Sequence, residues 1–136
     1  MGIATVNPTT GLTEKEFEPH SSEEVQARVA EVGFDWAEPR GAWEKIREEV
    51  EEVGQELDLP GSAALEDEIG DLLFSVVNLA RLSRVDAPTA LARANHKFRK
   101  RFGVLERLAR ERGVVVETAG LEVLDGLWGD AKREER

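Results

Sequence analysis

The stretch that decides the fold is residues 62–84, which read SAALEDEIGDLLFSVVNLARLSR. Ser62 is a typical helix N-cap residue, and the apolar positions between Leu65 and Leu82 cover most sides of the helix that they predict. A helix that is hydrophobic nearly all round is buried on several faces. We therefore expect residues 62–84 to form the central helix and to contribute to a subunit interface.

Four other segments have helical periodicity. They cover residues 21–32, 42–57, 86–112 and 121–132. Ser21 or Ser22 and Asp86 are the expected N-caps of the first and third of these helices, and Gly33 and Gly113 end them. No internal repeat and no strand pattern is found. The sequence thus predicts an all-α fold, a bundle of about four main helices, with residues 1–20 as an extended arm and residues 21–136 as a single helical domain.

The composition narrows the class of protein. The chain has 136 residues, a net charge of −10, no cysteine and two histidines, which excludes disulfides, thiolate nucleophiles and His-rich metal centres. It contains no long apolar run and no basic-then-apolar leader, so we expect a cytoplasmic protein without a membrane partner. The acidic balance argues against binding to a nucleic-acid polymer.

The charge is segregated along the chain. Residues 44–71 carry eleven acidic side chains against two basic ones, a net charge of −9, whereas residues 93–112 carry eight basic ones against two acidic ones, a net charge of +6. This pattern fits a site where a cation and a polyanion meet. The alternative is that both charged helix faces are only solvated.

Carboxylates three residues apart lie beside the packing faces of two helices. Glu49 and Glu52 border the apolar stripe of residues 42–57, and Glu68 and Asp71 share one flank of residues 62–84. If these faces meet, four carboxylates converge, and each pair at about 4 Å repels by roughly 4 kcal/mol at an effective dielectric constant near 20. Either a cation lies between them or the faces do not meet. Oxygen ligands of this kind select Mg²⁺, Mn²⁺ or Ca²⁺.

These carboxylates belong to a longer pattern, Glu48-Glu49-x-x-Glu52, a spacer, and Glu68-x-x-Asp71. The pattern is accompanied by VGFDW at 32–36, DLLFSVVNLAR at 71–81 and NHKFRKRF at 95–102, and by Leu127-Trp128 and Ala131-Lys132. Together these motifs resemble the MazG nucleoside triphosphate pyrophosphohydrolase family over about residues 31–136.

The resemblance implies an all-α dimer or tetramer that clears nucleotide pools by hydrolysing nucleoside triphosphates to monophosphates and pyrophosphate, with Mg²⁺ as the metal and Mn²⁺ as a substitute. It implies that Glu49, Glu52, Glu68 and Asp71 bind the metal and that Glu48 orients or deprotonates the attacking water. The implied substrate-binding residues are Asn78, Asn95, Lys97, Arg101, Trp128 and Lys132: the basic ones hold the phosphates, the asparagines make polar contacts, and Trp128 stacks on or beside the base.

The chain departs from the family in two ways. Many members have two such domains in tandem, whereas this chain has one, similar to the C-terminal copy, and position 64 is Ala where some relatives have a basic residue. The first thirty residues are instead similar to the start of an aldehyde dehydrogenase, but the nucleophile of that enzyme is a cysteine, which this chain lacks. The alternative function is a non-catalytic oligomerisation or regulatory module whose acidic patch binds a cation.

Overall fold

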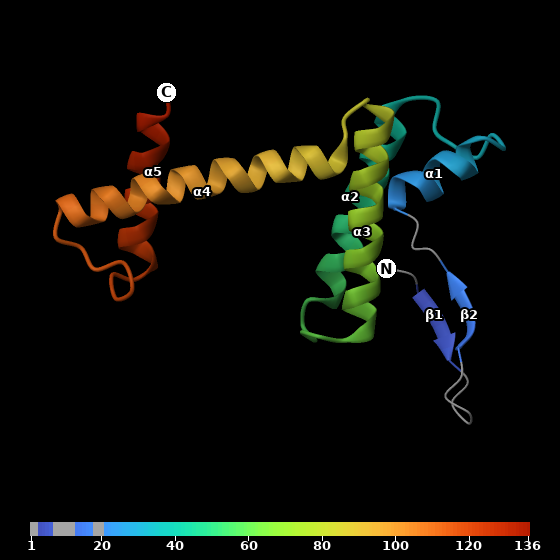
Figure 1. Ribbon diagram of the computed structural model, residues 1–136, viewed down its shortest axis with the longest axis horizontal. Coiled ribbons are helices and arrows are strands. Elements are labelled where there is room, and N and C mark those ends of the chain that lie inside the picture. Colours follow the sequence, from blue (N-terminus) through green and yellow to red (C-terminus); the bar gives the residue numbers. More distant parts are fainter. Residues whose placement is uncertain (1–2, 7–12, 18–20) are drawn as a thin grey trace. The chain divides into compact units, whose positions relative to one another are not determined.

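The structure is a computed structural model that describes residues 3–6, 13–17 and 21–136 (Figure 1). Its elements, in chain order, are β1 (Ile3–Val6), β2 (Thr13–Phe17), α1 (Ser22–Ala30), α2 (Pro39–Glu56), α3 (Ala63–Leu82), α4 (Ala87–Glu111) and α5 (Leu121–Glu134). The chain divides into two compact units, residues 1–85 and residues 86–136. Each unit is described by itself.

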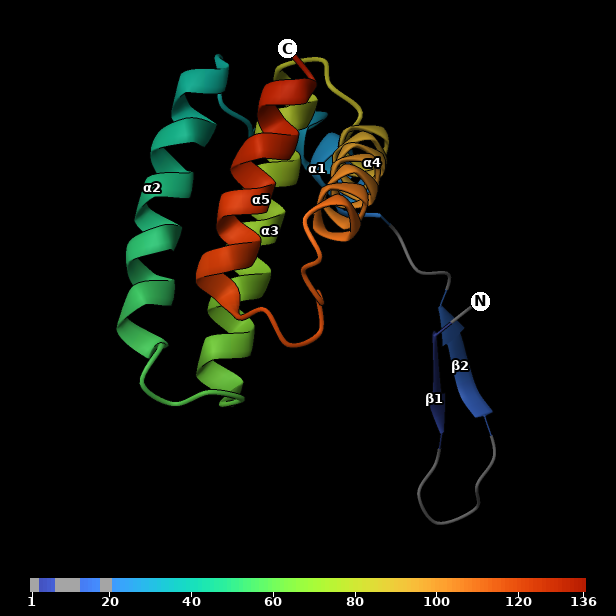
Figure 2. The same ribbon diagram turned by 90° about the vertical axis from the view of Figure 1, so that its left-hand side faces the viewer.

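In the first unit α2 and α3 form an antiparallel helical hairpin, and the two helices lie side by side in both views (Figures 1 and 2). Ala42 and Ile46 are the buried apolar residues of α2. The short helix α1 packs on α3. The apolar stripe of α2 therefore brings the flanking carboxylates of α2 toward α3.

The predicted starts of α1, α3 and α4 are confirmed by their caps, whereas α2, expected from residue 42, begins at Pro39 without a side-chain cap. Ser21 and Glu24 form a reciprocal capping box at the start of α1. The hydroxyl of Ser62 accepts a hydrogen bond from the backbone N–H of Leu65, and the carboxylate of Asp86 accepts one from that of Thr89. These caps satisfy backbone donors that the first turn of a helix leaves without partners.

The prediction that the sequence contains no strand was wrong. β1 and β2 pair antiparallel, with Ile3 opposite Phe17 and Ala4 opposite Glu16. Strands of four and five residues are too short to show a clear hydrophobic period. They are defined by their pairing with each other, and no local sequence window contains that pairing. The rest of the arm expected over residues 1–20 lies outside the described residues.

The second unit is a pair of helices with its own core. Leu105, Leu108 and Ala109 of α4 pack with Leu127 and Ala131 of α5. Gly113 follows α4 with a φ of +66°, a backbone conformation that glycine adopts without steric cost. The core of both units is thus built by helices, and the all-α fold class is confirmed.

Within one chain, α3 is less buried than its sequence predicts. Its buried residues are the polar Ser75 and Asn78, whereas the side chain of Leu73 is 62% exposed and Ile69 and Val76 are also exposed. The subunit interface expected on this helix stays a prediction. No helix among the described residues combines the length and apolar character that crossing a bilayer requires.

Candidate functional site

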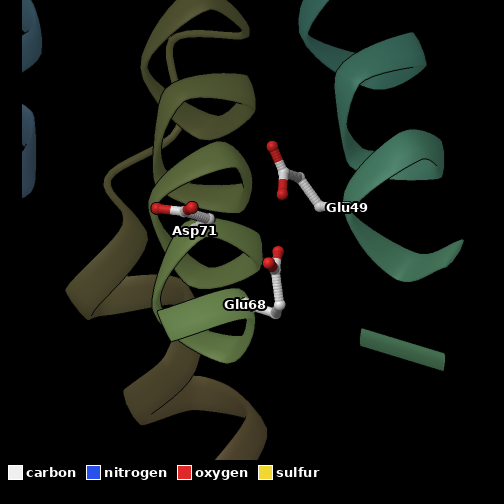
Figure 3. Close-up of side chains that lie close together, drawn as sticks. All are labelled: Glu49, Glu68 and Asp71. Atoms are coloured by element: carbon white, nitrogen blue, oxygen red, sulfur yellow. The ribbon is translucent and has the colours of Figure 1, made fainter. Parts of the chain in front are cut away.

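Three of the four predicted metal ligands come together between α2 and α3. Glu49 extends from α2 toward α3, which carries Glu68 and Asp71 one helical turn apart (Figure 3). One carboxylate oxygen from each residue lies within 4.8 Å of those of the other two. We call these three residues the carboxylate cluster. The faces of α2 and α3 do meet, and a cation bound here would offset the repulsion between the carboxylates.

Glu49 is the buried member of the carboxylate cluster. Only 4% of its surface is exposed, and its Oε2 has no hydrogen-bond partner among the described residues. Its Oε1 lies 2.7 Å from Nζ of Lys45, one turn earlier on α2. This hydrogen bond to Glu49, together with a second one to Glu48, raises the pKa of Lys45 above its ordinary value. Lys45 therefore supplies one positive charge to a site that holds several negative ones.

Glu52 adjoins the carboxylate cluster without being one of its three members. Its pKa is raised, first because its carboxyl shares a hydrogen bond with Glu49, and then by desolvation and by repulsion from Glu49 and Glu68. A raised pKa means that the neutral form is favoured, as expected where negative charge accumulates. A cation placed here would reverse that preference.

Glu48, the predicted catalytic base, lies on the exposed side of α2. Its carboxylate is 3.3 Å from Nζ of Lys45 and is not part of the carboxylate cluster. Lys45 was missed by sequence reasoning, although its spacing of four residues from Glu49 is a signal for a helical ion pair.

The donor chemistry of the cluster fits a hard divalent cation. It offers only carboxylate oxygens, the ligands that Mg²⁺, Mn²⁺ and Ca²⁺ prefer. The unpartnered Oε2 of Glu49 supports this fit, because a buried carboxylate oxygen without a partner is costly. The roles of Glu49, Glu52, Glu68 and Asp71 as metal ligands stay predictions.

In the second unit, Arg101 and Trp128 lie in contact. The guanidinium of Arg101 is 5.1 Å from the centroid of the Trp128 ring, and the ring of Phe98 is 4.9 Å from that of Trp128. Arg101 also donates two hydrogen bonds to Glu135, at 3.0 and 2.6 Å, which hold the pKa of Glu135 below its ordinary value. Arg101 therefore already binds an anionic group in this structure.

The other predicted substrate residues differ in exposure. Asn95, Lys97 and Lys132 are exposed in the second unit. Asn78 is buried in the first unit, where its Oδ1 accepts hydrogen bonds from Arg81, which also pairs with Asp35. Neither Arg81 nor Asp35 was singled out from the sequence, because 46 positions separate them. The roles of the predicted substrate residues stay predictions.

The fold and the site define a protein of the all-α class with a carboxylate cluster suited to a hard cation. Residues 38–103 match the family profile of the MazG nucleotide pyrophosphohydrolase domain. The chain is 44% identical to the nucleoside triphosphate pyrophosphohydrolase/pyrophosphatase MazG of Thermotoga maritima over 108 residues, and 40% identical to the nucleoside triphosphate pyrophosphohydrolase of Escherichia coli K12 over 116 residues. These matches identify residues 38–103 as a MazG domain.

The matches differ in how much of each protein they cover. They include 79% and 84% of this chain but only 41% and 44% of the Thermotoga and Escherichia proteins. The chain thus spans less than half the length of these curated relatives. A separate stretch of similarity, 57% identical over 30 residues, links it to an aldehyde dehydrogenase of Paenarthrobacter nicotinovorans and covers 22% of this chain and 7% of that protein.

Proposed function

We propose that this protein is a Mg²⁺-dependent nucleoside triphosphate pyrophosphohydrolase. Water attacks the α-phosphorus, the bond to the bridging oxygen of the β-phosphate breaks, and the products are a nucleoside monophosphate and pyrophosphate. The observation that carries the proposal is the carboxylate cluster, which lies within the residues that match the MazG domain. The names of the relatives support the same reaction.

The first unit supplies the groups for the metal and the water. Glu49, Glu68 and Asp71, with Glu52 beside them, would hold Mg²⁺ or, as a substitute, Mn²⁺. When bound, such an ion polarises phosphoryl oxygens and lowers the pKa of coordinated water. Glu48 would orient or deprotonate the attacking water, and its exposed position on α2 leaves it accessible to solvent. Lys45, which pairs with Glu48 and Glu49, would keep their carboxylates in place.

The second unit supplies cations for the phosphates. Lys97, Arg101 and Lys132 would bind the triphosphate and stabilise the charge that develops on the leaving pyrophosphate. The pairing of Arg101 with Glu135 supports this role, since its Nε and one terminal nitrogen both donate to Oε2 of Glu135, and a phosphate oxygen accepts the same donors. Asn78 and Asn95 would add polar contacts, and Trp128 an aromatic surface. We further propose that the active form is a homo-oligomer and that it acts in the cytoplasm.

The test is the product of the reaction. Purified protein with Mg²⁺ and a panel of nucleoside triphosphates is expected to release pyrophosphate and monophosphate, and not single phosphate. Asp71→Asn is expected to reduce turnover by at least about 100-fold while helicity by circular dichroism is unchanged, because it removes a carboxylate from the cluster. Asp67→Asn, at an exposed acid on the same helix, is the matched control and is expected to keep full activity.

Two results would contradict the proposal. The first is the absence of turnover on every triphosphate with either Mg²⁺ or Mn²⁺. The second is full activity in Asp71→Asn, which would remove this residue from the metal site. Thermal stabilisation by Mg²⁺ that nucleotides do not alter would favour the alternative, a non-catalytic module with a cation-binding acidic patch.

A further inference from the structure

Arg101 of α4 is held by Glu135, the residue that follows α5. Two hydrogen bonds join the guanidinium to Oε2 of Glu135, one from Nε at 3.0 Å and one from a terminal nitrogen at 2.6 Å. The two side chains are only 18% and 21% exposed, whereas those of the neighbouring ion pair, Arg107 with Glu134, are 44% and 43% exposed. Since solvent screens an exposed ion pair more strongly, the pair of Arg101 and Glu135 is the firmer of the two.

An aromatic ring holds the same guanidinium from another side. The guanidinium carbon of Arg101 lies 5.1 Å from the centroid of the Trp128 ring, within the range of a cation–π contact. Trp128 is itself fixed by Phe98, whose ring centroid is 4.9 Å away. The side chain of an unpaired arginine samples many rotamers. The carboxylate of Glu135 and the ring of Trp128 together restrict Arg101 to one arrangement.

This arrangement leaves part of the guanidinium open. Arginine has N–H donors on Nε and on both terminal nitrogens. Glu135 accepts one hydrogen bond from Nε and one from a single terminal nitrogen, and the other terminal nitrogen of Arg101 has no hydrogen-bond partner among the described residues. The edge formed by the two terminal nitrogens is a fork that can donate to two oxygens of one phosphate group. The contact with Glu135 therefore fixes Arg101 without covering this edge.

Positive charge still prevails around Glu135. The hydrogen bond from Arg101, followed by the charges of Arg101, Lys100 and Lys97, holds the pKa of Glu135 below its ordinary value. One carboxylate thus lies among three cationic side chains, and these four residues together keep a net positive charge. An approaching polyanion is still attracted to them.

We propose that Glu135 is a positioning residue for phosphate binding, which holds Arg101 against Trp128 so that the open edge of the guanidinium meets the triphosphate. The inference rests on the proposed function for the identity of the ligand. A side chain that is already fixed loses less conformational freedom when a ligand binds, so the affinity is higher. The opposite hypothesis, that Glu135 competes with the phosphates for Arg101, predicts the opposite change in affinity when Glu135 is replaced.

The experiment measures binding of inorganic tripolyphosphate by isothermal titration calorimetry, in buffer without divalent metal. Glu135→Ala is expected to weaken binding by about tenfold, because Arg101 must then be ordered by the ligand. Glu135→Gln keeps an acceptor oxygen without the charge and is expected to restore part of the affinity. Removal of a competing negative charge would instead strengthen the binding of the anion in both variants.

Glu134→Ala is the matched control. It removes the same charge one residue earlier, at the acid that pairs with Arg107, and is expected to bind tripolyphosphate as the unmodified protein does. NMR of the Nε–H group of Arg101 reports the contact directly. Exchange of this proton with water is expected to be slow in the unmodified protein and in Glu134→Ala, and fast in Glu135→Ala, because a hydrogen-bonded proton is protected.

A double-mutant cycle tests whether Glu135 acts through Arg101. Arg101→Lys keeps the positive charge but lacks the planar fork that Glu135 holds. In this background, Glu135→Ala is expected to cause no further loss of affinity, since residues that act as a pair give non-additive effects. In hydrolysis assays, Glu135→Ala alone is expected to lower kcat/KM by about tenfold, in line with the loss of phosphate affinity.

Three results overturn the inference: no binding of tripolyphosphate to the unmodified protein, binding by Glu135→Ala that is equal or tighter, and an equal loss from Glu135→Ala with arginine or lysine at position 101. Failure of the proposed function has a different signature. In that case tripolyphosphate binding still depends on Glu135, but no nucleoside triphosphate is hydrolysed.

Discussion

Glu52 shows the cost of concentrating negative charge beside the carboxylate cluster. Its pKa is raised above 4.5 by Glu49, by desolvation and by Glu68. An acid whose pKa is higher in the folded than in the unfolded state binds its proton more tightly when the protein is folded. Its contribution to the free energy of unfolding therefore falls as the pH rises through the range of these two pKa values. The metal-free protein therefore loses stability at this position between acidic and neutral pH.

Glu52→Gln tests this argument in the presence of a chelator. At pH 7 the variant is expected to have a higher Tm than the unmodified protein, because a neutral amide does not repel Glu49. At pH 4, where Glu52 is largely protonated, the difference in Tm is expected to disappear. Adding Mg²⁺ at pH 7 should favour the unmodified protein if Glu52 binds the metal. A lower Tm for the variant at pH 7 without metal would contradict the conclusion that repulsion from neighbouring carboxylates destabilises the charged form of Glu52.

At the scale of single elements, the helix pair of the second unit depends on few buried side chains. Leu127 of α5 is 3% exposed and packs in the core with Leu105 and Leu108. Leu127→Ala is expected to lower the free energy of unfolding by about 2–5 kcal/mol. The substitution removes buried apolar atoms and also leaves a cavity, which a core of two helices cannot close. The measurement is urea denaturation followed by circular dichroism.

The matched control for this change is Leu121→Ala, at the first residue of the same helix. Leu121 is 84% exposed, so the same chemical change is expected to alter the free energy of unfolding by about 0.5 kcal/mol or less. Equal effects of the two substitutions would show that the core described for α4 and α5 does not set the stability of this unit.

The sequence predicted features that neighbouring residues determine, and it missed those that depend on contacts between distant segments. Caps at Ser21, Ser62 and Asp86 are encoded within three residues, and the predicted starts of α1, α3 and α4 agree with the structure. The β1–β2 pair joins two segments with no period of their own. The contact between Arg101 and Glu135 spans 34 positions, and no window of sequence contains both.

In the candidate site, too, the sequence predicted the spacing of residues along each helix but not the contacts between the helices. The spacing of Glu68 and Asp71 placed them on one flank of a helix, and the apolar stripe of α2 indicated that Glu49 borders a packing face. That these faces meet, and that Lys45 pairs with the buried Glu49, became visible only in the structure. The burial of Gln26 of α1, which is 6% exposed, had no sequence signal either, because it depends on how α1 packs on α3.

At the scale of the whole molecule, α3 has apolar side chains that the described residues of the first unit leave exposed. Ile69, Leu73 and Val76 follow one another at helical spacing and are all exposed. A helix of this composition is stable when another surface covers it, and a second copy of the chain supplies an identical apolar stripe. We therefore predict that the protein is a homo-oligomer in solution, with α3 in the interface.

Leu73→Asp tests this prediction by sedimentation equilibrium. The unmodified protein is expected to sediment as a dimer or tetramer, and the variant as a monomer, because two-fold symmetry would bury two carboxylates without partners. Leu121→Asp introduces the same charge at an exposed leucine of α5 and is expected to leave the oligomer intact. A monomeric unmodified protein, or an oligomer that survives Leu73→Asp, would contradict the interface.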